Sequence, residues 1–141
     1  MKRAKGSIPG AVAAFMAIFG LHANAHEFTA RVTYYCPGEA GSKKTSRGTI
    51  PAEGVTVAVD PRLIPYGSTV EIPALAGLVG CGVFKALDTG SAVKSRKAAK
   101  AHGKNVPVVD VYLSSRRRVE ELTKLLGRDG HFMRVLVREG L

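Results

Sequence analysis

The sequence predicts a mainly β protein, a small barrel with one helix late in the chain. Short segments rich in valine, threonine and aromatic residues recur between clusters of glycine, proline and serine, a pattern typical of many short strands joined by turns. Apolar residues at helical spacing occur late, in residues 116–126. A length of 141 residues allows one domain, and no repeat or linker suggests a second.

The first 25 residues have the composition of a secretory signal peptide. The apolar run, residues 8–21, is shorter than the ~20 residues that span a bilayer. We therefore expect cleavage after Ala25, a mature domain of residues 26–141 without a transmembrane segment, and a periplasmic or cell-envelope location. The basic start and the cleavage site are Lys2, Arg3 and Lys5, and Ala23-Asn24-Ala25.

Six segments are expected to form strands, because each shows alternating apolar side chains or a short valine-rich run. They are residues 28–35, 55–59, 69–72, 83–88, 106–112 and 132–137. Residues 39–54, rich in glycine, serine, threonine and lysine, are expected to form a long loop. The prolines in residues 60–68 exclude a helix or a central strand there.

Two helices are predicted. The late one runs over residues 116–126, with Ser114 or Ser115 as its N-cap and Gly127 as its stop. A shorter one over residues 95–102 is capped by Ser95 and stopped by Gly103.

Three of the four aspartates stand at the end of a predicted strand or inside one. Strands are poor in aspartate, because a short charged side chain neither packs on a pleated surface nor tolerates burial. The three positions therefore predict a site. The alternative, that they only open turns, suits Asp60 before Pro61 but suits Asp110 poorly, because its strand continues. Alternation puts Asp60 with Ala58 and Thr56, Asp88 with Ala86 and Phe84, and Asp110 with Val108 and Tyr112.

The order of these motifs resembles the 3D domain, a family named for three aspartates, and more distantly the catalytic domain of membrane-bound lytic transglycosylase A. The resemblance covers about residues 29–137. It implies a six-stranded double-psi β-barrel that acts on peptidoglycan. The matching segments are VAVDPRLIPYGS at residues 57–68, ALDTG at 86–90 and VDVY at 109–112.

The resemblance also implies a lytic transglycosylase, which cleaves the MurNAc-GlcNAc β-1,4 bond with a single acid/base. Asp110 falls where the catalytic acid falls, and it is the aspartate most enclosed in apolar sequence, as an acid protonated near neutral pH requires. Asp88 would stay ionised and stabilise positive charge on the sugar, with Asp60 as a supporting residue. Substrate contacts are expected from Thr45, in the segment Thr45-Ser46-Arg47-Gly48, and from Thr89, Gly90 and Lys94.

The sequence departs from the family pattern after Gly90. Ser91 stands where relatives commonly have a second glycine, and residues 95–105 are an insertion. We expect the insertion to form a basic flap that holds the anionic wall; the alternative is an inert, solvated segment. Its basic residues include Arg96, Lys97 and Lys100. If these changes abolish catalysis, the protein would be a non-catalytic peptidoglycan-binding module, although such modules usually expose aromatic rows and this chain lacks tryptophan.

The formal net charge of +10 falls to +7 when the three basic residues of the leader are removed. Nucleic acid is the usual partner of such a charge, but no nucleic-acid motif or aromatic-interleaved basic patch is present. Peptidoglycan glycan strands are the better partner, because their stem peptides carry free carboxylates. The alternative is that the charge serves solubility alone. We expect a monomer.

Cys36 and Cys81 are the two cysteines. Export to an oxidising compartment predicts a disulfide between them, worth roughly 4 kcal/mol on the chain-entropy model. The alternative, a catalytic thiol with His102 or His131 as its base, lacks an activating feature. The histidines show no metal-ligand spacing and the aspartates form no Asp-x-Asp loop. We therefore expect no metal and no cofactor.

Overall fold

The computed structural model describes residues 25–38, 43–127 and 131–140. The predicted leader lies outside these residues apart from Ala25, so its cleavage stays a prediction. Within the described ranges, no helix is both long enough and apolar enough to cross a membrane.

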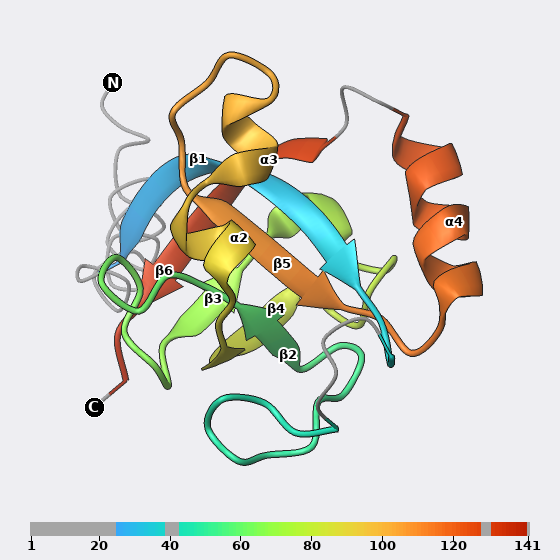
Figure 1. Cartoon of the computed structure of the whole chain (residues 1–141), viewed down its shortest axis with the longest axis horizontal. Coiled ribbons are helices and arrows are strands. Elements are labelled where there is room, and N and C mark those ends of the chain that lie inside the picture. The colour runs from blue at the N-terminus through green and yellow to red at the C-terminus, as the bar shows by residue number, and fades with distance from the viewer. Residues whose placement is uncertain (1–24, 39–42, 128–130, 141) are drawn as a thin grey trace, which may run out of the picture.

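Six strands in the described part of the chain close into one barrel (Figure 1). They are β1 His26–Tyr35, β2 Thr56–Ala58, β3 Thr69–Glu71, β4 Val83–Asp88, β5 Val108–Tyr112 and β6 Phe132–Arg138. Their order around the barrel is β1-β5-β2-β4-β3-β6. The pairs β1–β5 and β2–β4 are parallel, and the other four pairings are antiparallel. The predicted mainly β, six-stranded barrel is confirmed.

Valine side chains at alternate strand positions fill much of the barrel interior. Val109 and Val111 of β5 are fully buried on either side of Asp110, and Val57 and Val59 enclose Ala58 in the same way. β-Branched side chains pack well on a pleated surface, and burying each one stabilises the fold by about 1.5 kcal/mol or more. Because these valines point inward, Asp110 between them points out of the barrel.

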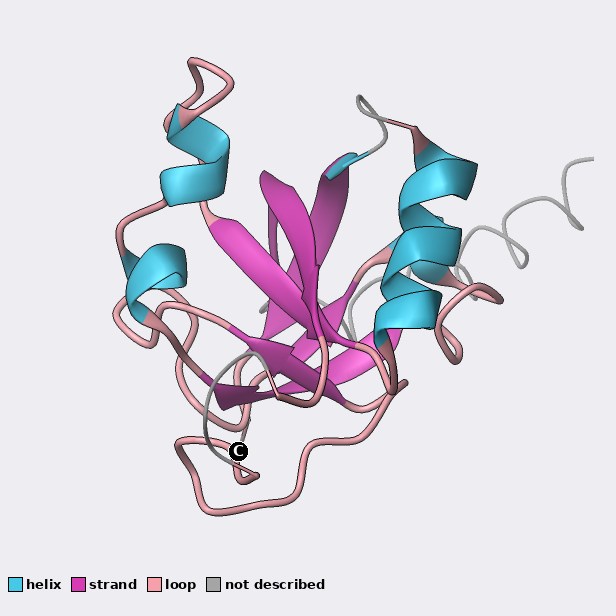
Figure 2. Ribbon diagram, turned by 45° about the vertical axis from the view of Figure 1, so that its right-hand side comes forward, coloured by secondary structure: helices cyan, strands magenta, loops and turns pink. Residues whose placement is uncertain are grey.

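The late helix is confirmed at both ends. α4 spans Arg116–Leu126, the hydroxyl of Ser115 accepts a hydrogen bond from the backbone N–H of Arg118, and Gly127 follows with φ of 71°. It lies on one side of the strands, and two shorter helices, α2 Ser91–Lys94 and α3 Lys97–Lys100, lie on another (Figure 2). The short 3-10 helix η1, Pro73–Leu75, follows β3.

The single helix expected over residues 95–102 is wrong. The chain forms α2, Ser91–Lys94, directly after β4, and then α3, Lys97–Lys100. Arg96 between them has φ of 58°, a left-handed conformation that ends one helix before the next begins. Ser95 is therefore the C-terminal cap of α2 instead of the N-cap of a longer helix.

The predicted disulfide is also wrong, because both cysteines are free thiols. Cys36 follows β1 and is buried, whereas Cys81 precedes β4 and is exposed. Three strand steps separate β1 from β4 in either direction around the barrel, so the two cysteines lie on opposite sides of its core. A disulfide needs Cα atoms within about 7 Å of each other.

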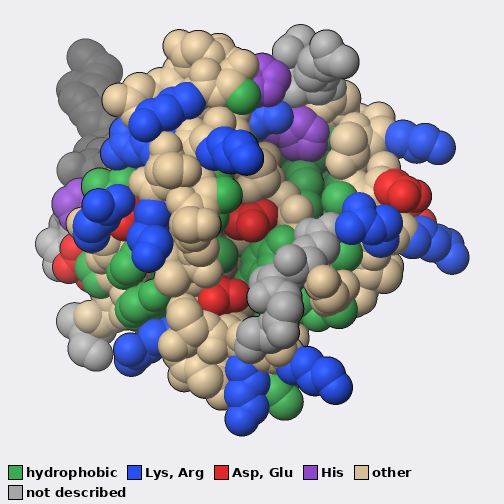
Figure 3. Space-filling model, in the orientation of Figure 1, with side chains coloured by type: hydrophobic (Ala, Val, Ile, Leu, Met, Phe, Trp, Pro, Cys, Tyr) green, Lys and Arg blue, Asp and Glu red, His purple; other side chains and the backbone are tan. Residues whose placement is uncertain are grey.

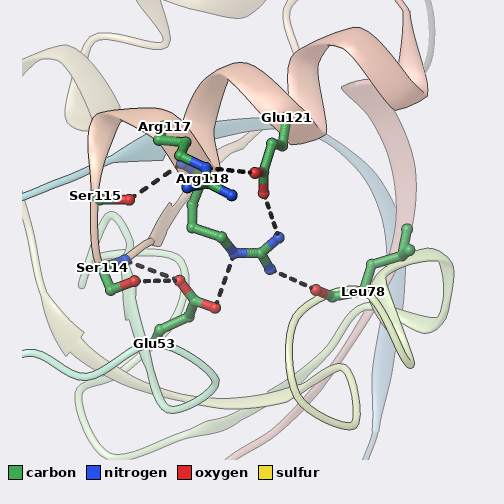
Figure 4. Close-up of polar contacts among 7 residues, drawn as sticks. All are labelled: Glu53, Leu78, Ser114, Ser115, Arg117, Arg118 and Glu121. Atoms are coloured by element: carbon green, nitrogen blue, oxygen red, sulfur yellow. Dashed lines mark hydrogen bonds and ion pairs between the residues drawn. The ribbon is translucent and has the colours of Figure 1, made fainter.

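Glu53, in the loop before β2, fastens α4 to the barrel (Figure 4). Its Oε2 accepts a hydrogen bond of 3.2 Å from Arg118, and its Oε1 accepts two from the backbone N–H and hydroxyl of Ser114, at 2.9 and 3.0 Å. Arg118 also donates to the carbonyl of Leu78 at 2.8 Å. Burial raises the pKa of Glu53, but the hydrogen bonds from Ser114 and Arg118 outweigh it and hold this pKa below its usual value.

Asp60 opens the turn between β2 and β3 and binds Arg62 with both carboxylate oxygens. Arg62 Nε lies 2.9 Å from Oδ1 and Nη2 lies 2.8 Å from Oδ2, while the Arg62 backbone N–H donates to Oδ1 at 3.0 Å. These hydrogen bonds hold the pKa of the buried Asp60 below its usual value. Arg62 also donates to the carbonyl of Lys94 at 3.3 Å, which ties the turn to α2.

Replacing Glu53 by glutamine should lower the free energy of unfolding by about 1 kcal/mol at neutral pH, because hydrogen bonds to a charged acceptor are weakened. The lowered folded-state pKa means that this contribution is present above the unfolded-state pKa and is lost as pH falls through the folded-state pKa. Urea unfolding at neutral and at strongly acidic pH measures both effects. Glu120→Gln, on the exposed face of α4, is the matched control; equal losses in the two variants would contradict the anchoring role.

Replacing Asp60 by asparagine should destabilise the fold by about 2 kcal/mol, because a buried, hydrogen-bonded partner of Arg62 is lost. The pKa of Asp60 is lowered by folding, so its contribution also vanishes as pH falls through the folded-state pKa. Thermal unfolding across this pH range is the measurement. A variant as stable as the wild type at neutral pH would show that the Asp60–Arg62 contact does not stabilise the turn.

Candidate functional site

The register of four neighbouring strands places two aspartates in one row. Thr33 of β1 pairs with Asp110 of β5, Asp110 with Ala58 of β2, and Ala58 with Asp88 of β4. Two strand spacings, roughly 10 Å, therefore separate the backbones of Asp110 and Asp88. Only the methyl group of Ala58 stands between them, which leaves room for a ligand.

A register shift in the β2–β4 pairing brings Asp88 into this row. Val57 pairs with Ala86, but the next residue, Ala58, pairs with Asp88, so one β4 residue is skipped. Strict alternation predicts Asp88 on the face of Ala86, which is in the core; this expectation is wrong. A β-bulge changes which way the following side chain points, and Asp88 lines a cavity with Ala58 and Asp110 instead.

That cavity, of about 260 Å³, adjoins two others that also have Tyr35 in their walls. We call the three together the Tyr35 groove. Both aspartates line the cavity of about 260 Å³, which we call the shared cavity. Asp88 also lines the cavity that contains Lys43 and Lys44. Asp110 also lines the cavity that contains Lys97. Figure 3 shows acidic side chains near the centre of this face and Lys and Arg side chains around them.

Asp88 is held by three hydrogen-bond donors. The Tyr35 hydroxyl donates to Oδ2 at 3.0 Å, and the backbone N–H groups of Ser46 and Thr89 both donate to Oδ1 at 2.9 Å. None of these donors is charged. These three hydrogen bonds hold both carboxylate oxygens of Asp88 in place.

Asp110 has different surroundings. Its Oδ1 accepts a hydrogen bond of 2.9 Å from Thr33 Oγ1. Val93 and Val108 line the cavities around it, and its companions Val108 and Tyr112 line the Tyr35 groove, as alternation predicts. Asp110 is only half-buried, however, and the most buried of the three aspartates is Asp60. Apolar neighbours along a strand do not enclose a side chain that points outward.

Tyr35 lies at the centre of the groove. Its ring meets the edge of Tyr112, with centroids 5.3 Å apart and planes at 75°. Burial, with the nearby carboxylate of Asp88, raises the pKa of Tyr35 far above its usual value. The phenol therefore keeps its proton and remains a hydrogen-bond donor.

The predicted substrate-binding residues fall in different places. Thr89 and Gly90 line the shared cavity, and Thr89 Oγ1 is buried without a hydrogen-bond partner in the part of the chain that the structure describes. Thr45 is buried, and its hydroxyl is engaged with Thr49 at 2.7 Å inside its own turn. Lys94 is exposed and lines none of the three cavities. Asp60 likewise lines none of these cavities, and its carboxylate binds Arg62 within the turn.

Three residues of the site were missed from the sequence: Thr33, Tyr35 and Ser46. Ser46 belongs to the segment Thr45-Ser46-Arg47-Gly48, from which a substrate contact by Thr45 was expected. This segment does reach the site, but it is the backbone N–H of Ser46 that donates to Asp88. The sequence offers one signal for Thr33 and Tyr35 as site residues: both carry a hydroxyl, and they stand two residues apart near the end of a predicted strand. Their meaning depends on the β1–β5 pairing, which the sequence does not reveal.

Basic side chains stand at both ends of the Tyr35 groove. Lys97 and other residues of α2 and α3 form one wall, so the insertion lies beside the site as expected. Lys43 and Lys44 line the cavity at the other end. Arg96 instead donates to Asn105, at 3.1 Å to its side chain, and closes the insertion on itself.

Among the described residues, no three histidine, cysteine, aspartate or glutamate side chains gather as a metal site would require. The arrangement offers carboxylates, hydroxyls and amines, the groups of acid–base chemistry on a polar ligand.

Comparison with known proteins gives a family. Three crystal structures of the lytic transglycosylase MltA from E. coli match, one of them with bound chitohexaose, at 18–21% identity and TM-scores of 0.41–0.42. These matches cover 69–70% of this chain but 28% of theirs, so the chain spans less than a third of their length. No curated protein matches. The model of the 3D domain matches residues 55–136, more than half of the sequence, and the chain belongs to the 3D domain family.

Proposed function

We propose that this protein is a lytic transglycosylase-like enzyme that cleaves the β-1,4 bond between MurNAc and GlcNAc in peptidoglycan. The observation that supports it most is that Asp88 and Asp110 line one cavity with different hydrogen-bond partners. Glycosidic cleavage needs a carboxylic acid for the leaving oxygen and negative charge near the sugar carbon that becomes positive. Two carboxylates with unlike surroundings can divide these tasks.

In the first step, protonated Asp110 gives its proton to the glycosidic oxygen. The bond from that oxygen to C1 of MurNAc breaks, GlcNAc leaves with the proton as a hydroxyl, and positive charge develops on the muramyl ring. The ionised Asp88 stabilises this charge, because its three neutral donors hold it in place without cancelling it.

In the second step, the Asp110 carboxylate takes the proton of the muramyl 6-hydroxyl. The freed oxygen bonds to C1 and closes a 1,6-anhydro ring, which restores the proton to Asp110. No water is consumed. One residue thus serves as acid and then as base, which requires a position open to the groove, and the half-buried Asp110 has one.

The walls of the Tyr35 groove suit a wall polysaccharide. Tyr35 and Tyr112 offer ring faces and edges to sugar rings, and Lys43 and Lys97 offer positive charge to the carboxylates of stem peptides. The substrate, together with the leader predicted for residues 1–25, places the proposed activity in the periplasm or cell envelope.

Asp110→Asn should reduce turnover of purified sacculi to background, because an amide cannot donate and retrieve a proton. General acid–base assistance is worth ~10²–10⁴-fold, and the upper end is expected because both steps use Asp110. Asp88→Asn should leave weaker but measurable turnover. Mass spectrometry of the released muropeptides is the measurement, with unfolding curves to show that both variants fold.

The products decide between the alternatives. Anhydromuramyl ends from the wild type support the transglycosylase, whereas reducing ends would make the protein a hydrolase. A wild type that binds sacculi without releasing products would make it the binding module. Wild-type turnover by Asp110→Asn would remove Asp110 from the acid role.

Replacing Lys43 and Lys97 together by glutamine should weaken binding to sacculi and flatten its dependence on salt, because two positive charges beside an anionic ligand are removed. Co-sedimentation with sacculi over a range of ionic strength is the measurement. Lys124→Gln on the outer part of α4 is the control, since Lys124 is exposed and outside the groove. If the double variant and the control bind alike, the basic residues of the groove do not contact the wall.

A further inference from the structure

We propose that Thr33 and Tyr35 of β1 are positioning residues, one for each aspartate of the Tyr35 groove. The inference rests on the proposed function and adds to it two residues that lie outside the range matched by the 3D domain model. Thr33 Oγ1 donates to Asp110 Oδ1 at 2.9 Å, and the Tyr35 hydroxyl donates to Asp88 Oδ2 at 3.0 Å. Both residues act through the carboxylates.

β1 can reach both aspartates because Thr33 and Tyr35 are two residues apart, on one face of the strand. Thr33 pairs with Asp110 across the parallel β1–β5 ladder, so a short hydroxyl suffices. Asp88 lies two strands further on, and the longer phenol of Tyr35 spans this gap across the groove. The sizes of the two side chains match the distances that they have to cover.

Thr33 fixes the direction in which Asp110 presents its proton. A carboxyl group rotates freely about its Cβ–Cγ bond unless one oxygen is held, and the Thr33 hydroxyl holds Oδ1. The same hydrogen bond stabilises the carboxylate that remains once the proton has been given away. Thr33 therefore assists both the donation and the return of the proton.

Tyr35 holds the carboxylate of Asp88 in place with a hydrogen bond of 3.0 Å. The phenol stays protonated, because burial and the Asp88 carboxylate raise the pKa of Tyr35 far above its usual value. Its contact with the edge of Tyr112 fixes the ring. A rigid neutral donor stabilises an ionised carboxylate without neutralising the charge that the sugar is meant to meet.

Other charged and titratable groups line the cavities around both aspartates, and apart from the substituted residue itself they are the same in wild type and variants. Around Asp110 these are Asp88, Lys97, Tyr34 and Tyr35. Around Asp88 they are Asp110, Cys36, Lys43, Lys44, Tyr35 and Tyr112. A difference between a variant and the wild type therefore isolates the hydroxyl that was removed.

The pH dependence of turnover separates the two roles. In Thr33→Val the ionised form of Asp110 loses a donor, so the alkaline limb of the profile, where the acid is lost, moves to higher pH and kcat falls about tenfold. In Tyr35→Phe the ionised form of Asp88 loses a donor, so the acidic limb moves to higher pH. One variant broadens the profile and the other narrows it.

Two further variants control for structure. Thr33→Ser keeps the hydroxyl and should restore most of the turnover and the wild-type profile. Thr29→Val removes a hydroxyl from the same face of β1, at an exposed position paired with Arg134, and should leave the profile unchanged. If Thr33→Val merely unfolded part of the barrel, Thr33→Ser could not move the limb back. Identical limbs in Thr33→Val, Tyr35→Phe and the wild type would overturn the proposal.

A substrate-free measurement keeps this inference apart from the proposed function. The carboxyl carbon-13 resonance of Asp110 can be titrated in the wild type and in Thr33→Val, and its midpoint should move to higher pH in the variant. If it does so while the wild type releases no anhydromuramyl product, the Thr33 contact stands and the transglycosylase fails. If the wild type is active but neither the resonance nor either limb moves, the positioning roles of Thr33 and Tyr35 fail.

Discussion

The register of β1, β5, β2 and β4 is the constraint on which the site depends. It places Thr33, Asp110, Ala58 and Asp88 in one row, and the shift after Val57 makes Asp88 a member of that row. Without the shift, Asp88 would share the face of the buried Ala86, and an unpaired carboxylate in the core costs several kcal/mol. The β-bulge turns the side chain of Asp88 out of the core. A β2–β4 pairing without the bulge would be unfavourable, because it would bury this carboxylate.

The three family aspartates have similar sequence surroundings and different physical ones, because their partners differ in charge. Asp60 is buried against a guanidinium that neutralises it and uses both of its oxygens, which suits a turn and leaves little for a ligand. Asp88 is held by three neutral hydrogen-bond donors. Asp110 borders the groove, accepts a hydrogen bond from Thr33 and has apolar residues in the walls around it. These differences agree with the roles expected from the sequence, in which Asp60 supports the site, Asp88 stabilises charge and Asp110 transfers the proton.

Local rules predicted those elements whose interactions are local. The cap of α4 by Ser115 and its stop at Gly127 depend on neighbours in sequence, and valine patterning located the strands. The separation of Cys36 from Cys81 and the outward turn of Asp88 depend on which strands become neighbours. Barrel closure decides these points through contacts between residues far apart in the chain. The same closure explains why Thr33 and Tyr35 were missed, since a hydroxyl on a strand carries no meaning until its partner strand is known.

β1 contributes to the site and to the closure of the barrel at the same time. It lies outside the segment that the family model matches, yet it joins β5 to β6 and carries the hydroxyl donors of both groove aspartates. Without β1, the edges of β5 and β6 would be open and their backbone groups unpaired. The aspartates would then lose their donors in the same event that opens the barrel. A folded barrel is therefore sufficient to orient both carboxylates.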